Sequence, residues 1–414
     1  MASADGAATA VRQANARACL LALRAAGSPR TLADLAEQTG LSRPTVDAVL
    51  GELTAAGSVR PVDAAPSASP GRPARRFTFD PTCAAVAAID IGERSVQCLL
   101  ADAAGTALSR ERIDLGDVGP GQRLRAIEQA VRTCSEGRAL PAAVGVAVPG
   151  ILSAQGPLAQ SLAVADLVGV DVAAELAARL GCEVAVENDI KLAAYAEHHL
   201  SPTPTDIAFV QIGHRISVAL ILDGQILQGR HRLAGELGTQ RGMRWTRSSQ
   251  RGRLHWSTGE DARALVEAAA SGEQAAIAEI DEFCAQIAPR IASLVLTVDP
   301  EQVVIGGGLS RAGDTLLEPL RRHVHHLLTS PGKPELVRAR LTTDGALIGA
   351  LGLAFEHGSR RLTGVPGVPP PWQRFPVGPA LPEAGAAAPA AGAAEPAVGT
   401  ADPSADPTTS EGPS

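Results

Sequence analysis

The segment from residue 31 to residue 57 constrains this chain most, because its pattern predicts two short helices joined by a tight turn. Thr31 followed by Asp34 forms a capping-box start, and the first helix ends before Gly40, which permits the turn. Ser42 can cap the second helix. The apolar residues of the second helix follow the i, i+3, i+4, i+7 spacing of a buried face and are Val46, Val49, Leu50 and Leu53.

This arrangement predicts a helix-turn-helix, and the second helix is the candidate recognition helix. Such a helix lies in the major groove of DNA, where its first-turn side chains reach base edges and phosphates. The alternative is an ordinary helical hairpin without a DNA-binding role. The candidate DNA-contacting residues at the start of this helix are Ser42, Arg43, Pro44 and Thr45.

A supporting helix with a polar end is expected over residues 11–26. Arg12, Asn15 and Arg17 lie off its apolar face and suit phosphate contacts, which fix the register on a duplex without reading its sequence. The alternative is a solvated helix face. Every basic residue before Asp80 is an arginine, and acidic residues nearly balance them. Affinity for DNA should therefore need two copies of this module.

Two short strands, at residues 58–60 and 76–79, predict a wing next to the recognition helix. An Ala-, Pro- and Ser-rich connection joins them. Near its end, the extended Gly-Arg-Pro sequence could push Arg72 into a narrow minor groove, with Arg75 close by. The alternative is a flexible basic linker.

Composition limits the class of protein. The 414 residues are 45% hydrophobic and 20% charged, which suffices for more than one domain with a substantial core. No signal peptide or membrane-spanning run is visible, so we expect a cytoplasmic protein without a membrane partner. The cysteines are scattered singly, which predicts buried, reduced thiols. The net charge of −7 argues against wholesale coating of nucleic acid but allows a local basic module.

From Val86 onward the chain changes to apolar strands that end in glycine turns. The first strand, residues 86–92, ends in Asp-x-Gly, and a second is expected over residues 95–101. The motifs that follow in order are Val-Pro-Gly at 148–150, Glu-Asn-Asp at 187–189, Asp-Gly at 223–224, Ala-Gly-Glu at 234–236, Gly-Gly-Gly at 306–308 and Gly-Ala-Leu-Ile-Gly at 345–349.

In this order the motifs resemble the ROK family (repressors, open reading frames and sugar kinases), specifically its transcription-regulator branch. The resemblance implies an N-terminal α/β winged helix-turn-helix followed by a body of two actin-like α/β lobes, of the sugar kinase and ribonuclease H-like class, with a cleft between them. The expected domains are residues 1–80 for the DNA-binding domain and 81–362 for the body. Residues 363–414, rich in Pro, Ala and Gly, are expected to form a disordered tail.

The resemblance also implies a sugar site in the cleft. In kinases of the family, the Asp of Glu-Asn-Asp holds a sugar hydroxyl and removes its proton, and the Glu of Ala-Gly-Glu binds sugar hydroxyls. Asp189 and Glu236 match these positions, and paired carboxylates suit the vicinal hydroxyls of a hexose. The alternative is that both are surface charges. The expected ligand-binding residues are Pro149, Gly150, Asn188, Asp189, Lys191, Glu236 and Thr239.

Departures from the family pattern argue against phosphoryl transfer. In the kinases the first phosphate loop reads Asp-x-Gly-Gly-Thr, whereas here Glu93 follows Gly92 and puts a carboxylate where an anion would approach. The second loop normally alternates glycines, but residues 213–219 carry side chains that obstruct a close backbone cradle. We therefore expect no useful kinase activity and no catalytic residue, with Asp189 a vestigial base.

The family's metal ligands are also missing. Thr239 replaces the expected His, and no cysteine lies between Cys182 and Cys284, so a zinc site lacks its ligands and we expect neither metal nor cofactor. Thr239 also replaces a sugar contact, Lys191 replaces an Asn, and residues 162–167 lack the usual Pro-Asn-Leu. These changes allow an altered ligand, such as an acidic sugar or sugar phosphate that meets Lys191, or no ligand at all.

Together these features predict a transcriptional regulator, expected to be a repressor, that responds to a sugar-type ligand in a degenerate kinase cleft. It would bind a palindromic double-stranded DNA operator as a homodimer or homotetramer, because two-fold symmetry places two recognition helices in successive major grooves. Two alternatives stay open. One is a constitutive DNA-binding protein whose body serves only for dimerisation, and the other is an active ATP-dependent sugar kinase.

Overall fold

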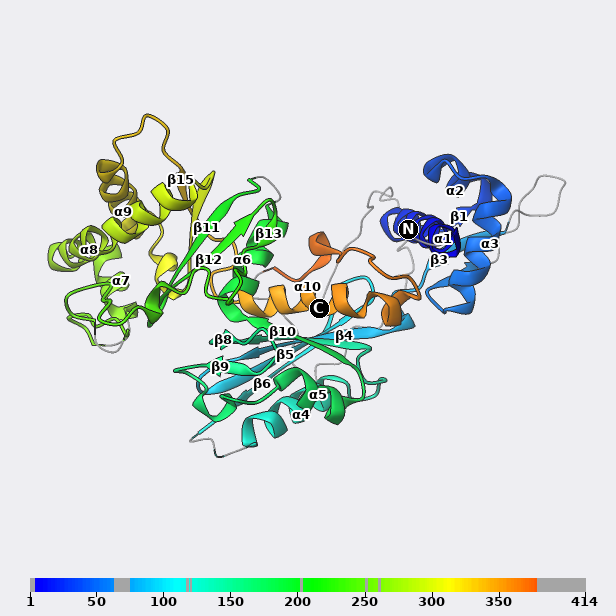
Figure 1. Ribbon diagram of the computed structural model, residues 1–414, viewed down its shortest axis with the longest axis horizontal. Coiled ribbons are helices and arrows are strands. Elements are labelled where there is room, and N and C mark those ends of the chain that lie inside the picture. The colour runs from blue at the N-terminus through cyan, green and yellow to red at the C-terminus, as the bar shows by residue number, and fades with distance from the viewer. Residues whose placement is uncertain are drawn as a thin grey trace, which may run out of the picture.

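A small N-terminal domain and a two-lobed body make up the structure, which is a computed structural model (Figure 1). The residues that it describes are 4–62, 75–116, 119, 121–201, 204–249, 252–259 and 262–377. No helix within these ranges is both long and apolar enough to span a membrane. All six cysteines are free, and only Cys83 is not fully buried, which confirms the expectation of reduced, buried thiols for the other five.

The N-terminal domain contains the expected helix-turn-helix. Its helices are α1 (Ala4–Ala26), α2 (Leu32–Thr39) and α3 (Arg43–Ala55). Thr31 and Asp34 form the predicted capping box at the start of α2, and Gly40 ends that helix with a left-handed φ of 71°. The Oγ atom of Ser42 caps α3 by accepting the Thr45 N–H at 3.3 Å. The four apolar residues predicted for the buried face of α3 are all buried.

The predicted wing strands are confirmed. A three-stranded antiparallel sheet has the order β1-β3-β2 and consists of β1 (Arg30–Thr31), β3 (Arg76–Phe79) and β2 (Val59–Val62). The connection between β2 and β3, with Arg72, lies outside the described residues.

The first lobe is built on a five-stranded sheet of order β10-β7-β4-β5-β6. Its strands are β4 (Ala85–Ile91), β5 (Ser95–Asp102), β6 (Ala107–Asp114), β7 (Ala143–Val148) and β10 (Glu183–Asn188). A small hairpin of β8 (Ile151–Leu152) and β9 (Leu158–Gln160) follows β7. The helices α4 (Gln122–Cys134) and α5 (Val172–Leu180) pack on one face, and α10 (Gly345–Thr363) packs on the other.

The second lobe has another five-stranded sheet, of order β13-β12-β11-β14-β15. Its strands are β11 (Ile207–Ile212), β12 (Ile216–Leu222), β13 (Gln225–Ile226), β14 (Gln302–Gly306) and β15 (Glu335–Arg338). The helices on its outer side are α7 (Arg263–Ala270), α8 (Gln274–Val298) and α9 (Asp314–Leu327).

Two helices lie between the two sheets and hold the lobes together. The helix α6 (Asp189–Leu200) packs on β12 of the second lobe, and α10 packs on β4 and β7 of the first (Figure 1). The two helices also pack closely on each other. At Gly349 of α10 an added Cβ atom would lie 2.1 Å from the Leu192 carbonyl oxygen of α6, so only glycine permits this contact. The backbones of α6 and α10 are therefore in close contact at this point.

The structure corrects the expected start of the disordered tail at residue 363. Helix α10 continues to that residue, and the Pro-rich segment 364–377 then folds back as packed chain. The high Pro and Gly content of this segment suggested disorder, but four of its apolar residues are buried in the main core. They are Val365, Val368, Trp372 and Phe375. We call residues 364–375 the C-terminal strap. The remainder of the predicted tail, 378–414, lies outside the described residues.

Candidate functional site

The start of α3 is the candidate DNA-binding surface. Ser42, Arg43 and Pro44 are exposed, and Thr45 is half-buried. The Ser42 and Thr45 hydroxyls lie 2.8 Å apart and hydrogen-bond to each other, which fixes the rotamers at this helix end. The structure thus gathers these four predicted contact residues on one solvent-facing turn.

The other predicted DNA contacts are more dispersed. Arg12 of α1 is exposed and pairs with Glu52 of α3, with 2.6 Å between Nη2 and Oε1. Asn15 is half-buried, and Arg75 lies over the Phe77 ring, 5.0 Å from its centroid. Arg17 faces the body instead, where its Nη2 donates to a strap carbonyl at 3.3 Å. A phosphate contact by Arg17 would require this interdomain hydrogen bond to break.

A cavity of about 800 Å³ lies between the two lobes. Residues from both lobes line it, together with the first turns of α6 and α10. The predicted ligand-binding residues that the structure brings together around this cavity are Pro149, Gly150, Asn188, Asp189, Glu236 and Thr239. The volume is within the range of about 300–1,000 Å³ that is usual for small-molecule sites.

Asn188 and Asp189 are positioned by the junction of β10 and α6. The Asn188 Oδ1 atom accepts the N–H groups of Ile190 and Lys191, both at 3.0 Å, and so caps α6. Its Nδ2 donates to the Gly150 carbonyl at 2.9 Å, which ties the Pro-Gly turn to this helix. Asp189 follows as the first residue of α6 and borders the cavity.

Carboxyl groups gather at this end of the cavity. Burial raises the pKa of Asp189 to about 6. Burial, with the nearby charges of Asp189 and Asp344, raises the pKa of Asp90 to about 7. Burial also raises the pKa of Glu236. A site of this kind offers several oxygen acceptors for hydroxyl groups, because a partly protonated carboxyl can both donate and accept.

Lys191, in contrast, does not line the cavity. It lies two residues beyond Asp189 on α6, about 200° around the helix, so it points away. Its Nζ donates to Gln228 Oε1 at 3.3 Å and to the Arg232 carbonyl at 3.2 Å. Arg232 Nη2 in turn lies 2.6 Å from Glu187 Oε2. The structure therefore places Lys191 in a buried polar network that holds the 228–232 loop, rather than in contact with the cavity.

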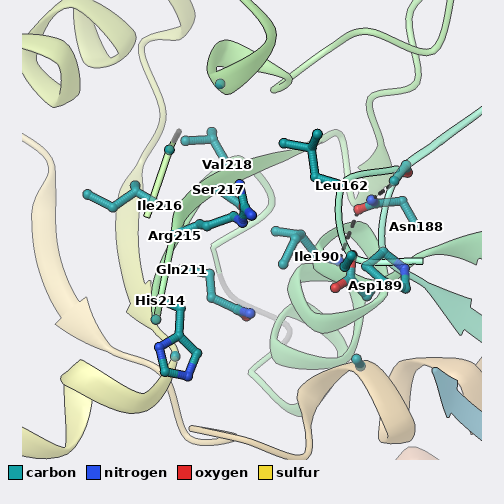
Figure 2. Close-up of a pocket in the computed structure, with 18 of the residues that line it drawn as sticks. Leu162, Asn188, Asp189, Ile190, Gln211, His214, Arg215, Ile216, Ser217 and Val218 are labelled. Carbon is teal, nitrogen blue, oxygen red and sulfur yellow. Dashed lines mark hydrogen bonds between the residues drawn. The ribbon is translucent and has the colours of Figure 1, made fainter. Parts of the chain in front are cut away.

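The opposite wall of the cavity carries basic and polar side chains. Figure 2 shows Gln211, His214 and Arg215 across the cavity from Asn188 and Asp189. Burial lowers the pKa of Arg215, and so does the neighbouring charge of a second arginine from the same lobe.

That second arginine, Arg253, joins the two lobes. Its Nη2 lies 2.8 Å from both carboxylate oxygens of Glu93, which sits in the β4–β5 turn of the first lobe. The two side chains are 28% and 46% exposed. Sequence reasoning identified Glu93 but missed Arg253, because 160 residues separate them and no local pattern marks the pair. The carboxylate and both arginines line the same cavity.

Two family models match the chain. The model described as ROK family matches residues 86–242 and 242–357. The model described as IclR helix-turn-helix domain matches residues 15–63.

Similar proteins include a bifunctional enzyme and a glucokinase. The bifunctional enzyme NanE/NanK of Brucella melitensis is 31% identical over 197 residues, which cover 44% of this chain and 37% of that enzyme. This chain thus spans well under half of that relative's length. A glucokinase of Thermotoga maritima is 26% identical over 307 residues, 65% of this chain and 96% of the glucokinase.

Solved structures share the fold. A ROK family transcriptional regulator, a homologue of the E. coli MLC protein, superposes with a TM-score of 0.66 at 20% identity, covering 85% of this chain and 98% of that one. A ROK family glucokinase from Streptomyces griseus, solved with glucose and AMPPNP, gives a TM-score of 0.57 at 21% identity over 65% of this chain and 99% of its own. The match to the regulator includes the N-terminal part of the chain as well as the body.

Proposed function

The chain belongs to the ROK family and carries an IclR-type helix-turn-helix domain, and from this premise we propose that it is a transcriptional repressor controlled by a sugar-derived ligand. It binds a palindromic operator as a homodimer or homotetramer. The observation that carries the proposal is the exposed first turn of α3, with Arg43, on a domain that is joined to a sugar-kinase-like body. Arginine at this position can reach a guanine edge or a phosphate.

The first phosphate loop supports a binding role for the cleft rather than a catalytic one. Phosphoryl transfer depends on backbone amides and cations that neutralise the phosphates. Here the side chain of Glu93 occupies the loop and is paired with Arg253. A carboxylate at this point repels a nucleotide phosphate, so we infer that the cleft binds a ligand without transferring a phosphoryl group.

The C-terminal strap offers a route from the cleft to the DNA-binding domain. The Pro366 and Pro369 carbonyls of the strap accept hydrogen bonds from Arg17 and Arg24 of α1, at 3.3 and 2.7 Å. At Gly364 an added Cβ atom would lie 2.6 Å from the Ala56 Cβ, just after α3. The strap therefore contacts the helices that orient the recognition surface.

The same strap also contacts the helix that borders the cavity. The Trp372 ring stacks on His199 of α6, with 4.5 Å between centroids and 8° between planes, and meets Tyr195 edge-on at 5.4 Å. Asp189 begins this same helix. A ligand that binds one position of α6 more tightly than another shifts the strap, and with it the DNA-binding domain.

Fluorescence anisotropy tests the proposal, with the full chain and DNA duplexes taken from the region upstream of its own gene. We expect salt-dependent, sequence-selective binding, and Arg43→Ala should weaken it by about 1–3 kcal/mol because one base or phosphate contact is lost. Arg132→Ala, which removes an exposed arginine from α4 of the body, is the matched control. Equal affinity for the native and a scrambled duplex, under all salt conditions, would refute the proposal.

A sugar kinase is the second candidate. It is favoured by the carboxyl of Asp189, whose pKa of about 6 suits a general base, and by the kinase relatives. Release of ADP in the presence of common hexoses, measured with a coupled assay, separates the two candidates. Turnover at the rate of ordinary kinases that is lost in Asp189→Asn would establish the kinase.

A further inference from the structure

We propose that a small organic carboxylate binds in a second cavity, which lies between the N-terminal domain and the body. This seam cavity has a volume of about 210 Å³, and none of the described residues that line it also lines the cleft between the lobes. The inference goes beyond the proposed function, because it adds a ligand site that is separate from the cleft. A ligand in the seam cavity contacts both parts of the chain at once.

The walls of the seam cavity come from both parts of the chain. The domain contributes residues of α1 and α3, and the body contributes the last turn of α10 and the start of the strap. One side is closed by a tight contact, because a Cβ atom added at Gly364 would lie 2.6 Å from the Ala56 Cβ. The complete site therefore exists only while the domain is docked on the body.

The buried residues that line the seam cavity are apolar. They are Ala16 of α1, Leu53 of α3 and Val365 of the strap, with exposed fractions of 6%, 2% and 3%. The volume has room for about seven water molecules, since one water takes about 30 Å³. An organic ligand of this size covers the apolar residues, which an inorganic ion would leave in contact with water.

The exposed residues at the edge of the seam cavity carry positive charge. Arg12 lines it from the domain, and Arg360 lines it from the body. Arg12 is paired with Glu52, with 2.6 Å between Nη2 and Oε1. The Arg360 side chain has no hydrogen bond or ion pair with any residue in the part of the chain that the structure describes. Two guanidinium groups against one carboxylate favour an anionic ligand.

A third guanidinium lies on the next turn of α1. Arg17 Nη2 donates to the Pro366 carbonyl at 3.3 Å, and Pro366 itself lines the seam cavity. The Arg17 Nε atom is buried and has no hydrogen-bond partner within the described residues. A buried donor without an acceptor is costly. A carboxylate accepts from several donors at once, so it can supply this acceptor while its charge offsets those of Arg12 and Arg360.

A ligand in the seam cavity stabilises the docked arrangement of the domain. Its contacts are shared between α1 and the end of α10, so it binds the docked arrangement more tightly than a separated one. Binding therefore shifts the population toward the docked arrangement. Hydrogen exchange in residues 364–370 of the strap should slow when the ligand is bound.

Isothermal titration calorimetry with the full chain tests the inference, at fixed ionic strength, with butyrate, lactate and pyruvate as probes. Butyramide, a neutral molecule of the same size as butyrate, and inorganic phosphate are the comparison ligands. We expect the carboxylates to bind more tightly than either of these. Arg360→Gln should weaken their binding by about ten-fold or more, because a charge-assisted contact is lost. Arg361→Gln removes the neighbouring arginine, which pairs with Glu183, and as the matched control should change nothing.

Two further variants change the charge of the seam cavity in opposite directions. Glu52→Gln removes a carboxylate from its edge and should tighten binding by about two- to five-fold, a small factor because the Glu52 side chain is 52% exposed. Gln13→Glu adds a carboxylate of the same size to the wall, so it should weaken binding by about ten-fold. The thermal midpoint of each unliganded variant shows that it is folded.

Slower exchange in residues 364–370 on addition of butyrate, together with these changes in affinity, supports the seam site. The inference is overturned if no carboxylate binds, if butyrate and butyramide bind alike, or if Arg360→Gln and Gln13→Glu bind butyrate as the wild type does. Binding that is lost in Arg253→Gln instead would place the ligand in the cleft and would also overturn it. None of these measurements involves DNA, so their outcome is independent of the proposed function.

Discussion

At the scale of a single residue, two opposing effects act on the ionisation of the Asp189 carboxyl. It begins α6, where the backbone favours a negative charge, yet it is buried beside the cavity, where ionisation is costly. The second effect is larger, because its pKa rises from the ordinary value of 3.8 to about 6. A carboxyl held in this way keeps its unfavourable charge at neutral pH until a ligand or a cation compensates it.

This conflict predicts how stability depends on pH. The folded protein keeps the Asp189 proton that the unfolded chain releases, so the free energy of unfolding falls as the pH rises from about 4 to about 6. Asp189→Asn removes this loss and should raise the free energy of unfolding by about 1–3 kcal/mol at pH 7.5, with little gain at pH 4. Urea denaturation of the ligand-free protein at both pH values measures the difference.

Asp114→Asn is the control for this prediction, because Asp114 is 76% exposed and pairs with an exposed arginine. Its substitution should change stability little at either pH. A gain in Asp189→Asn that is the same at pH 4 and pH 7.5 would show that ionisation of Asp189 is not its cause.

At the scale of helices and strands, the features that the sequence predicted correctly are those that depend on residues close together in the chain. The capping box at Thr31, the cap at Ser42 and the buried face of α3 were predictable because each depends on residues a few positions apart. The strap and the Glu93–Arg253 pair were not, since they depend on contacts between distant segments. Lys191 shows a third case: its place in the motif pointed to the cavity, but its direction on α6 turns it away.

The strap also leads to a prediction about the DNA-binding domain. Arg17→Ala combined with Arg24→Ala removes both side-chain hydrogen bonds from α1 to the strap carbonyls. Each such bond contributes about 1 kcal/mol, so the domain should separate from the body more often while both remain folded. Hydrogen exchange, followed by mass spectrometry, should speed up in residues 364–370 and remain unchanged in the central strands β4 and β7.

Arg12→Ala provides the control on the same helix, because the ion pair that it removes, with Glu52 of α3, lies within the domain. It should leave exchange in the strap unchanged. If the double variant also leaves the strap unchanged, burial of its apolar residues alone holds the domain in place, and the two arginines do not contribute.

At the scale of the whole molecule, the proposed function requires that charge and symmetry determine how DNA is bound. The chain carries a net charge of −7, and the arginines of the N-terminal domain are nearly balanced by acidic residues. One domain therefore supplies little non-specific attraction to the phosphate backbone. Two domains held by a symmetric body gain affinity, because binding of the second becomes intramolecular.

The last prediction follows from this need for two domains. Replacing one half of a palindromic operator with unrelated sequence should weaken binding by about 10²–10⁴-fold, since the gain from the second domain is lost. A change of a few fold is what a monomer acting alone would give. Anisotropy on the full and half operators measures the ratio, and analytical ultracentrifugation of the free protein and of the complex gives the number of chains bound. Full and half operators of equal affinity, with one chain on each, would contradict the symmetric arrangement and leave a single recognition helix as the whole of the interface.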